Sequence, residues 1–208
     1  MAELEETAAL KTKEVLGQVK RTEMPKDAKT VKTKWVYAIK TDTQGFVVRI
    51  KARVVALGIY RRSGIDYMET SSSVARMSSF RITAAISAEF DLVIYGGDIN
   101  TAYLDATLEI AQYVDKIEGY PCEDPSYVNV VRKALYGLRQ SGCEWNSEIN
   151  GCLSNRGFER CATKSCLYYL IDGEKIMLLL IYVGDVVRAT NDEECNIGLF
   201  LSSTRRMA

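Results

Sequence analysis

An unbroken apolar run lies in the C-terminal third of the chain. Ile176 to Tyr182 are seven consecutive apolar or aromatic residues, too short to cross a bilayer, and they predict a buried strand. Gly184 and Asp185 follow and predict the tip of a tight β-hairpin, after which β-branched residues resume. The carboxylate of Asp185 is then either a simple turn residue or, if a second strand brings another acid beside it, a metal ligand.

Other segments show the periodicity of helices and strands. Apolar residues at helical spacing predict helices over residues 3–20, 77–90 and 142–153. Strands are expected at residues 35–39, 46–56, 92–95, 113–120, 128–131 and 158–171. The first two of these strands flank a turn at residues 42–45 and predict a second hairpin. Tyr136 and Trp145 are expected to be core residues rather than platforms for base stacking.

Two polar features stand out against this pattern. Period-two alternation puts Arg49, Lys51 and Arg53 on one strand face, which either faces phosphate groups or is simply solvated. Asp98 follows a short apolar strand and two glycines, a position at a strand's carboxyl end where α/β sites commonly form. Asp98 is therefore a candidate partner for Asp185.

Composition narrows the chemistry that is available. The 208 residues include 27 basic and 27 acidic side chains, so no net charge argues for a nucleic-acid or membrane partner. The six cysteines lack C-x-x-C spacing and histidine is absent, which excludes mixed zinc sites and imidazole catalysis. The N-terminus lacks a secretory pattern, so we expect an intracellular protein, cytoplasmic or nuclear, that is neither secreted nor bound to a membrane.

A series of motifs in a fixed order carries a specific resemblance. The chain resembles the reverse transcriptase domain of Ty1/copia-type retrotransposon polyproteins over roughly residues 31 to 190. The segments that carry the likeness are Lys34–Tyr37, Lys51–Ala56 with Gly58, Gly64–Tyr67, Asp98–Leu104, Lys133–Gln140 with Trp145, Gly157-Phe158 with Cys166–Tyr168, and Tyr182–Asp185 where the family has YVDD.

The resemblance implies an α+β fold of fingers and palm, with an antiparallel sheet and flanking helices. It implies RNA-directed DNA polymerase activity with two Mg²⁺ ions on an RNA or DNA template-primer, with deoxynucleotides as substrates. Asp98 and Asp185 would be catalytic metal ligands. By the same likeness Lys51 and Arg53 would face the triphosphate, Tyr103 would act as a gate against ribose, and Gln140 would border the nucleotide pocket.

The chain departs from the family pattern at several positions. Gly184 replaces the first acid of the hairpin pair, which removes one of three carboxylates. Further departures are Leu57, Ser73, Ser141–Cys143 and Lys164-Ser165. We expect residues 1–30 to form a helix and linker, residues 31–190 the fingers and palm, incomplete at the C-terminus, and residues 191–208 a divergent tail.

These departures leave three interpretations open. The first is a degenerate, truncated reverse transcriptase with impaired activity. The second is a catalytically dead module that still binds nucleic acid through its cationic strand. The third is a relic that does not fold stably, because missing palm strands leave a sheet edge exposed. The oligomeric state is left open.

Overall fold

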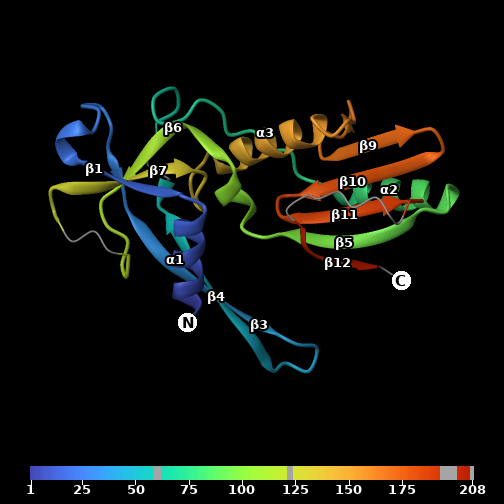
Figure 1. The fold of residues 1–208 in the computed structure, drawn as a ribbon, viewed down its shortest axis with the longest axis horizontal. Helices are drawn as coiled ribbons and strands as arrows, with labels where there is room; N and C mark the ends of the chain where they lie inside the picture. The colour runs from blue at the N-terminus through green and yellow to red at the C-terminus, as the bar shows by residue number, and fades with distance from the viewer. Residues whose placement is uncertain (59–61, 121–123, 193–200, 207–208) are drawn as a thin grey trace. The chain divides into compact units, whose positions relative to one another are not determined.

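The computed structural model describes residues 1–58, 62–120 and 124–192, together with the backbone of residues 201–206 (Figure 1). The chain divides into two compact units. The first unit comprises Met1–Ser71 and Tyr103–Trp145, and the second comprises Ser72–Ala102 and Asn146–Ala208. Within the described ranges, no helix has the length and apolar character that crossing a membrane requires.

The first unit contains helix α1 and two sheets. A four-stranded sheet has the order β1-β7-β6-β2, and β3 and β4 form a separate two-stranded sheet. A short 3₁₀ helix, Ala102–Asp105, precedes β6. The elements are α1 (Ala2–Thr12), β1 (Leu16–Lys20), a 3₁₀ turn (Arg21–Glu23), β2 (Thr30–Val31), β3 (Thr33–Thr41), β4 (Val47–Ala56), β6 (Thr107–Val114) and β7 (Tyr127–Lys133).

The N-terminal helix is shorter than its sequence pattern predicts. We expected a helix over residues 3–20, but α1 ends at Thr12 and Glu14 has a positive φ of 52°. Residues 16–20 instead form β1, which pairs antiparallel with β7. The prediction was wrong beyond Thr12 because the apolar residues of this stretch satisfy a strand as well as a helix, and only the pairing with β7 decides between them.

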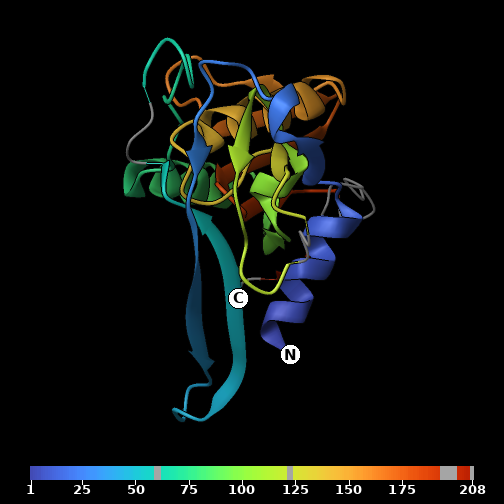
Figure 2. The same ribbon diagram turned by 90° about the vertical axis from the view of Figure 1, so that its left-hand side faces the viewer.

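The predicted hairpin at residues 35–56 is confirmed as β3 and β4, a long ribbon that extends from its unit with α1 beside its root (Figure 2). The turn is held by Asp42, whose Oδ1 accepts hydrogen bonds of 2.9 Å from the N–H groups of Gln44 and Phe46. At the other end of the ribbon, Oε1 of Glu6 in α1 accepts the N–H of Val54 at 3.2 Å. This buried carboxylate satisfies a donor on the free edge of β4.

The second unit is a six-stranded sheet of order β12-β5-β11-β10-β9-β8 with α2 packed against it. The predicted buried strand at residues 176–182 is confirmed, since β10 lies between β9 and β11 and Leu179 is fully buried. The elements are α2 (Met77–Glu89), β5 (Val93–Ile99), β8 (Glu159–Arg160), β9 (Leu167–Asp172), β10 (Lys175–Tyr182), β11 (Asp185–Thr190) and β12 (Leu201–Arg206). Helix α3 (Ser141–Ser154) carries the boundary between the units.

Three predicted strands differ from the observed ones. The strand and turn expected over residues 113–120 were wrong in position, because β6 spans Thr107–Val114 and pairs with β7, and residues 115–120 lie outside any strand. The strand expected over residues 158–171 is broken into β8 and β9, with residues 161–166 between them outside any strand. The short strand expected at residues 92–95 extends through Gly96 and Gly97 to Ile99, because β11 and β12 both pair with it. Asp98 therefore lies within β5, near its end, rather than in a connection after the strand.

Candidate active site

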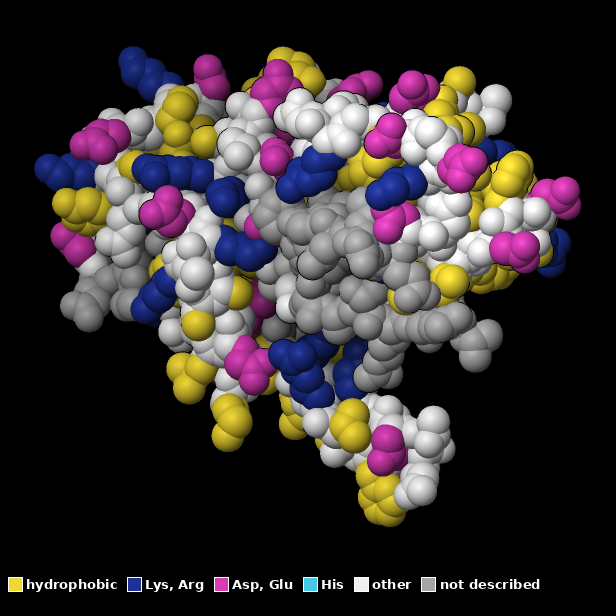
Figure 3. Space-filling view, turned by 45° about the vertical axis from the view of Figure 1, so that its right-hand side comes forward, with side chains coloured by type: hydrophobic (Ala, Val, Ile, Leu, Met, Phe, Trp, Pro, Cys, Tyr) yellow, Lys and Arg dark blue, Asp and Glu magenta, His cyan; other side chains and the backbone are white. Residues whose placement is uncertain are grey.

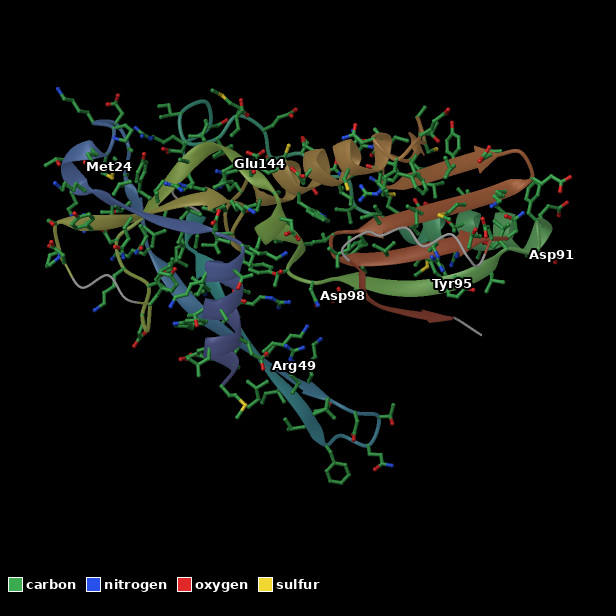
Figure 4. The ribbon with its side chains drawn as sticks, viewed as in Figure 1. Met24, Arg49, Asp91, Tyr95, Asp98 and Glu144 are labelled. Carbon is green, nitrogen blue, oxygen red and sulfur yellow. The ribbon has the colours of Figure 1, made fainter. Side chains whose placement is uncertain are left out.

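The two predicted metal-ligand acids face each other across neighbouring strands. Asp98 of β5 and Asp185 of β11 are direct partners in the antiparallel register. Directly opposed residues project to the same face of a sheet with Cβ atoms about 4.5–5.5 Å apart. Asp98 lies near the end of β5 (Figure 4). Its side chain is half-buried, whereas that of Asp185 is exposed. The sheet thus brings together the two carboxylates that the sequence places 87 positions apart.

The turn beside these acids differs by one residue from the predicted one. Tyr182 and Asp185 form the closing pair of the hairpin, so the two turn residues are Val183 and Gly184. The prediction of a Gly184-Asp185 tip was wrong because Asp185 is already held in β11 by its pairing with β5. Val183 has a φ of 56°, a strained value for a β-branched residue of the kind that functional sites often hold.

Gly184 packs closely against the strand that carries Asp98. Its carbonyl oxygen accepts the N–H of Ile99 at 2.7 Å. A Cβ atom at this position would lie 3.2 Å from the carbonyl oxygen of Ile99 and 3.3 Å from Oδ1 of Asp98. The φ of Gly184 is not in the left-handed region, so an L-residue is sterically allowed after a shift of a few tenths of an ångström. Any side chain here would begin beside the Asp98 carboxylate.

Few side chains at this end of β5 and β11 could bind a metal ion. Carboxylate oxygens are the ligands that Mg²⁺ prefers, so Asp98 and Asp185 suit it in chemical type. In the part of the chain that the structure describes, no three acidic, cysteine or histidine side chains are grouped closely enough to hold a metal ion. Two carboxylates stand where the sequence resemblance implies three.

The predicted nucleotide-binding residues lie in the first unit, and two of them meet through a third residue. Arg53 lies over the ring of Tyr136, with its Cζ atom 4.9 Å from the ring centroid. The ring of Tyr103 packs against Tyr136 edge to face, with centroids 5.3 Å apart and an interplanar angle of 72°. Lys51 is opposite Ala38 and shares the face of Arg53 on the ribbon.

Tyr136 is only half-buried, unlike Trp145, which is 3% exposed as expected for a core residue. Burial raises the pKa of the Tyr136 hydroxyl, while the charge of Arg53 and a hydrogen bond from it act in the opposite direction. Tyr136 is therefore not the core residue that we predicted, and its contact with Arg53 was not predicted. The motif that contains it gives no periodic signal that would have revealed this contact.

Gln140 is buried at the start of α3, with 3% of its surface exposed. The backbone carbonyl oxygen of Gln140 accepts the N–H of Glu144 at 2.9 Å in the first turn of the helix. Within the described chain, neither Nε2 nor Oε1 of the Gln140 side chain has a hydrogen-bond partner. A buried amide without partners is costly, so it is a group that an incoming ligand or water would stabilise.

The chain is similar to known proteins along most of its length. The family model described as "Reverse transcriptase (RNA-dependent DNA polymerase)" matches residues 18–200. The chain is 35% identical over 169 residues to a retrovirus-related Pol polyprotein from transposon RE1 of Arabidopsis thaliana, covering 81% of this chain and 12% of that protein. It is 31% identical over 179 residues to the Pol polyprotein from transposon TNT 1-94 of Nicotiana tabacum, covering 85% of this chain and 14% of that protein.

The chain thus spans about an eighth of the length of these curated relatives, which are copia-type polyproteins. The matched residues, 18–200, include both aspartates of the sheet and the cluster of Arg53, Tyr103 and Tyr136. On this evidence the chain belongs to the reverse transcriptase family, as a reverse transcriptase domain of the copia type.

Proposed function

We propose that the chain is the fingers and palm of an RNA-directed DNA polymerase of a copia-type retrotransposon, impaired in this copy at Gly184. Asp98 and Asp185 are its metal ligands. The observation that carries the proposal is the direct register of these two acids on β5 and β11. Lys51, Arg53, Tyr103 and Gln140 contact the deoxynucleotide, and RNA or DNA template-primer is the partner.

Mg²⁺ bound by these acids would activate the primer hydroxyl and neutralise the leaving pyrophosphate. The protein supplies the adjacent ends of two interior strands, β5 and β11, for this task. The register of β5 against β11 fixes both carboxylates at one face, while Tyr182 closes the hairpin directly opposite Asp185. Arg53 and Lys51 provide fixed positive charge for a triphosphate.

Gly184 accounts for the proposed impairment. The Cβ atom of an aspartate at this position would lie 3.3 Å from Oδ1 of Asp98. Its side chain would add a third carboxylate at the same end of β5 and β11. With two acids instead of three, the metal is held more weakly and positioned less well. A loss of several kcal/mol in transition-state stabilisation lowers a rate by orders of magnitude, at about 1.4 kcal/mol for each factor of ten.

Primer extension on an RNA template with Mg²⁺ or Mn²⁺ tests this proposal. The proteins compared are the natural chain, Gly184→Asp, and Gly184→Asp combined with Asp98→Asn. We expect extension by Gly184→Asp at least about 100-fold faster than by the natural chain. The added Asp98→Asn substitution should abolish that gain, because it removes a ligand from the restored set.

Gly151→Asp is the matched control, since Gly151 has open space around its Cβ position and no positive φ. It adds the same charge on α3 and should not change extension. Extension by the natural chain at the rate of Gly184→Asp would contradict the proposed impairment. Silence of both proteins, each folded, would contradict the polymerase proposal itself.

A second function, nucleic-acid binding without turnover, is favoured by the charge of the β3–β4 ribbon. The register places five basic residues on one face, and basic side chains gather near the root of the ribbon in Figure 3. They are Lys34, Lys40, Arg49, Lys51 and Arg53. A row of cations along one face suits the phosphate backbone of a nucleic acid and releases condensed counterions on binding.

The salt dependence of binding tests this second function. We expect affinity for a template-primer duplex to fall steeply with salt, and Lys40→Gln to reduce the slope of log K against log salt by about 1. Lys26→Gln, at an exposed lysine outside the ribbon, should leave the slope unchanged. Equal effects of the two substitutions would show that the ribbon face is not the binding surface.

A further inference from the structure

Tyr136 lies between two residues that we propose to contact the nucleotide, Arg53 and Tyr103. One face of its ring carries the guanidinium of Arg53, at 4.9 Å from the centroid. The ring of Tyr103 meets it edge to face at 5.3 Å. Tyr136 is therefore the side chain through which the proposed triphosphate contact and the proposed sugar gate are joined.

The backbone around Tyr136 is fixed against strand β4. The N–H of Ala56, the last residue of β4, donates to the carbonyl oxygen of Tyr136 at 2.7 Å. Gly137 has a φ of 86°, and a Cβ atom there would lie only 2.1 Å from the carbonyl oxygen of Ala56. A Cβ at Gly58 would likewise lie 2.6 Å from the carbonyl oxygen of Gly137.

Two glycines thus permit an approach that no other residue allows. The approach holds the Cα of Tyr136 next to the strand that carries Arg53, so the contact between the two side chains does not depend on a mobile loop. A cation over an aromatic face is attracted by the ring quadrupole, which restrains the plane of a long and otherwise flexible side chain. Burial raises the pKa of Tyr136, so the ring stays neutral at physiological pH.

We propose that Tyr136 is a positioning residue of the nucleotide pocket: its ring holds the guanidinium of Arg53 for the triphosphate and fixes Tyr103 as the sugar gate. The inference rests on the proposed function. It predicts that Tyr136 affects both the affinity for a triphosphate and the preference for deoxyribose over ribose. A residue that only filled space would affect neither quantity selectively.

Equilibrium binding of dATP and ATP to the template-primer complex in the presence of Mg²⁺ tests the inference without requiring turnover. We expect Tyr136→Leu to weaken dATP binding about 5- to 10-fold and to reduce the preference for dATP over ATP. Tyr136→Phe keeps the aromatic face but loses the hydrogen bond from Arg53 to the hydroxyl, so it should weaken dATP binding less than Tyr136→Leu does, by no more than about 3-fold. Affinity for the template-primer should not change in either variant.

Tyr37→Leu is the matched control, because Tyr37 is an exposed tyrosine of the same unit outside the cluster. Tyr136→Met, a flexible side chain without an aromatic face, replaces Tyr136→Leu should that variant fail to fold. In an Arg53→Gln background, either Tyr136 substitution should cause little further loss of dATP affinity, because the guanidinium that the ring positions is already absent. The reduced preference for dATP over ATP should persist in that background, because it depends on the contact with Tyr103.

Unchanged dATP affinity in Tyr136→Leu or Tyr136→Met would overturn the inference, as would a Tyr136→Phe variant that binds as weakly as they do. Absence of dATP binding by the natural chain would also overturn it. A Tyr136-dependent affinity in a protein that does not extend primers, even with Gly184→Asp, would contradict the polymerase proposal and leave this inference intact.

Discussion

Two hairpins that the sequence predicts have opposite environments. In β10 the residues Met177 to Ile181 are all buried, with β9 on one side and β11 on the other. In the described chain, no further strand pairs with the β3–β4 ribbon. Four of its large apolar side chains are each more than half exposed: Tyr37, Ile39, Phe46 and Val48. The unbroken apolar run of β10 is therefore buried, whereas much of the ribbon, in which basic residues alternate with apolar ones, remains exposed.

The difference matches the groups that each hairpin carries. The β10–β11 hairpin presents Asp185, whose position against Asp98 is fixed by hydrogen-bonded strands on both sides. The β3–β4 ribbon presents cations, and its fixed points lie at its root, where Glu6 accepts the N–H of Val54 and Gly137 packs on Ala56. Rigid placement comes from sheet neighbours in one hairpin and from a few anchoring contacts in the other.

The largest expected effect on the free energy of unfolding comes from a buried residue of β10, compared with an exposed residue of β3. Leu179→Ala removes a fully buried side chain from β10 and should lower the free energy of unfolding by about 2–5 kcal/mol. Ile39→Ala, at a residue 65% exposed on β3, should change it by less than about 0.5 kcal/mol. Urea denaturation followed by circular dichroism measures both, and similar losses would show that the ribbon is covered in solution.

The second prediction concerns the root of the ribbon. Gly137→Ala should cost about 3 kcal/mol or more, because it adds a clash with the carbonyl oxygen of Ala56 to the strain of a left-handed residue. Gly45→Ala at the tip, with a φ of 90° and open space, should cost about 1–2 kcal/mol from strain alone. Equal losses in thermal melts would mean that the close approach at Gly137 does not anchor the ribbon.

The smallest expected effect concerns Glu6. Burial raises its pKa above the ordinary glutamate value, so folding favours the protonated form. That contribution to stability is present below the unfolded-state pKa and is lost as the pH rises through the folded-state pKa. Glu6→Gln, which can still accept the N–H of Val54, should therefore raise stability by up to about 1 kcal/mol at neutral pH and by less in acid.

Glu5→Gln serves as the control for this pH dependence. Glu5 forms an exposed ion pair of 2.7 Å with Arg49, and the loss of this pair should change stability by less than about 1 kcal/mol. Melting temperatures across pH 4 to 8 distinguish the two variants. A Glu6→Gln variant that is less stable than the natural chain at every pH would show that the ionised carboxylate is the stabilising form.

The sequence predicted the elements whose periodicity is unambiguous. The long apolar run of β10, the β3–β4 hairpin and the apolar spacing of α2 and α3 each follow from local patterns. Residues 16–20 and the glycines of β5 were misassigned because their structure depends on strands elsewhere in the chain. β7 converts the end of an expected helix into β1, and β11 and β12 draw Gly96 and Gly97 into a strand.

The ordered motifs, the absence of histidine and the glycine at position 184 are properties of the sequence alone, and they determined the family and the chemistry open to it. The tertiary structure decided which side chains meet. It set Asp98 directly against Asp185 and placed Tyr136 between Arg53 and Tyr103. The physical reason is that strand register and close backbone approach are long-range properties, which depend on how distant segments pair and pack rather than on the residues next to them.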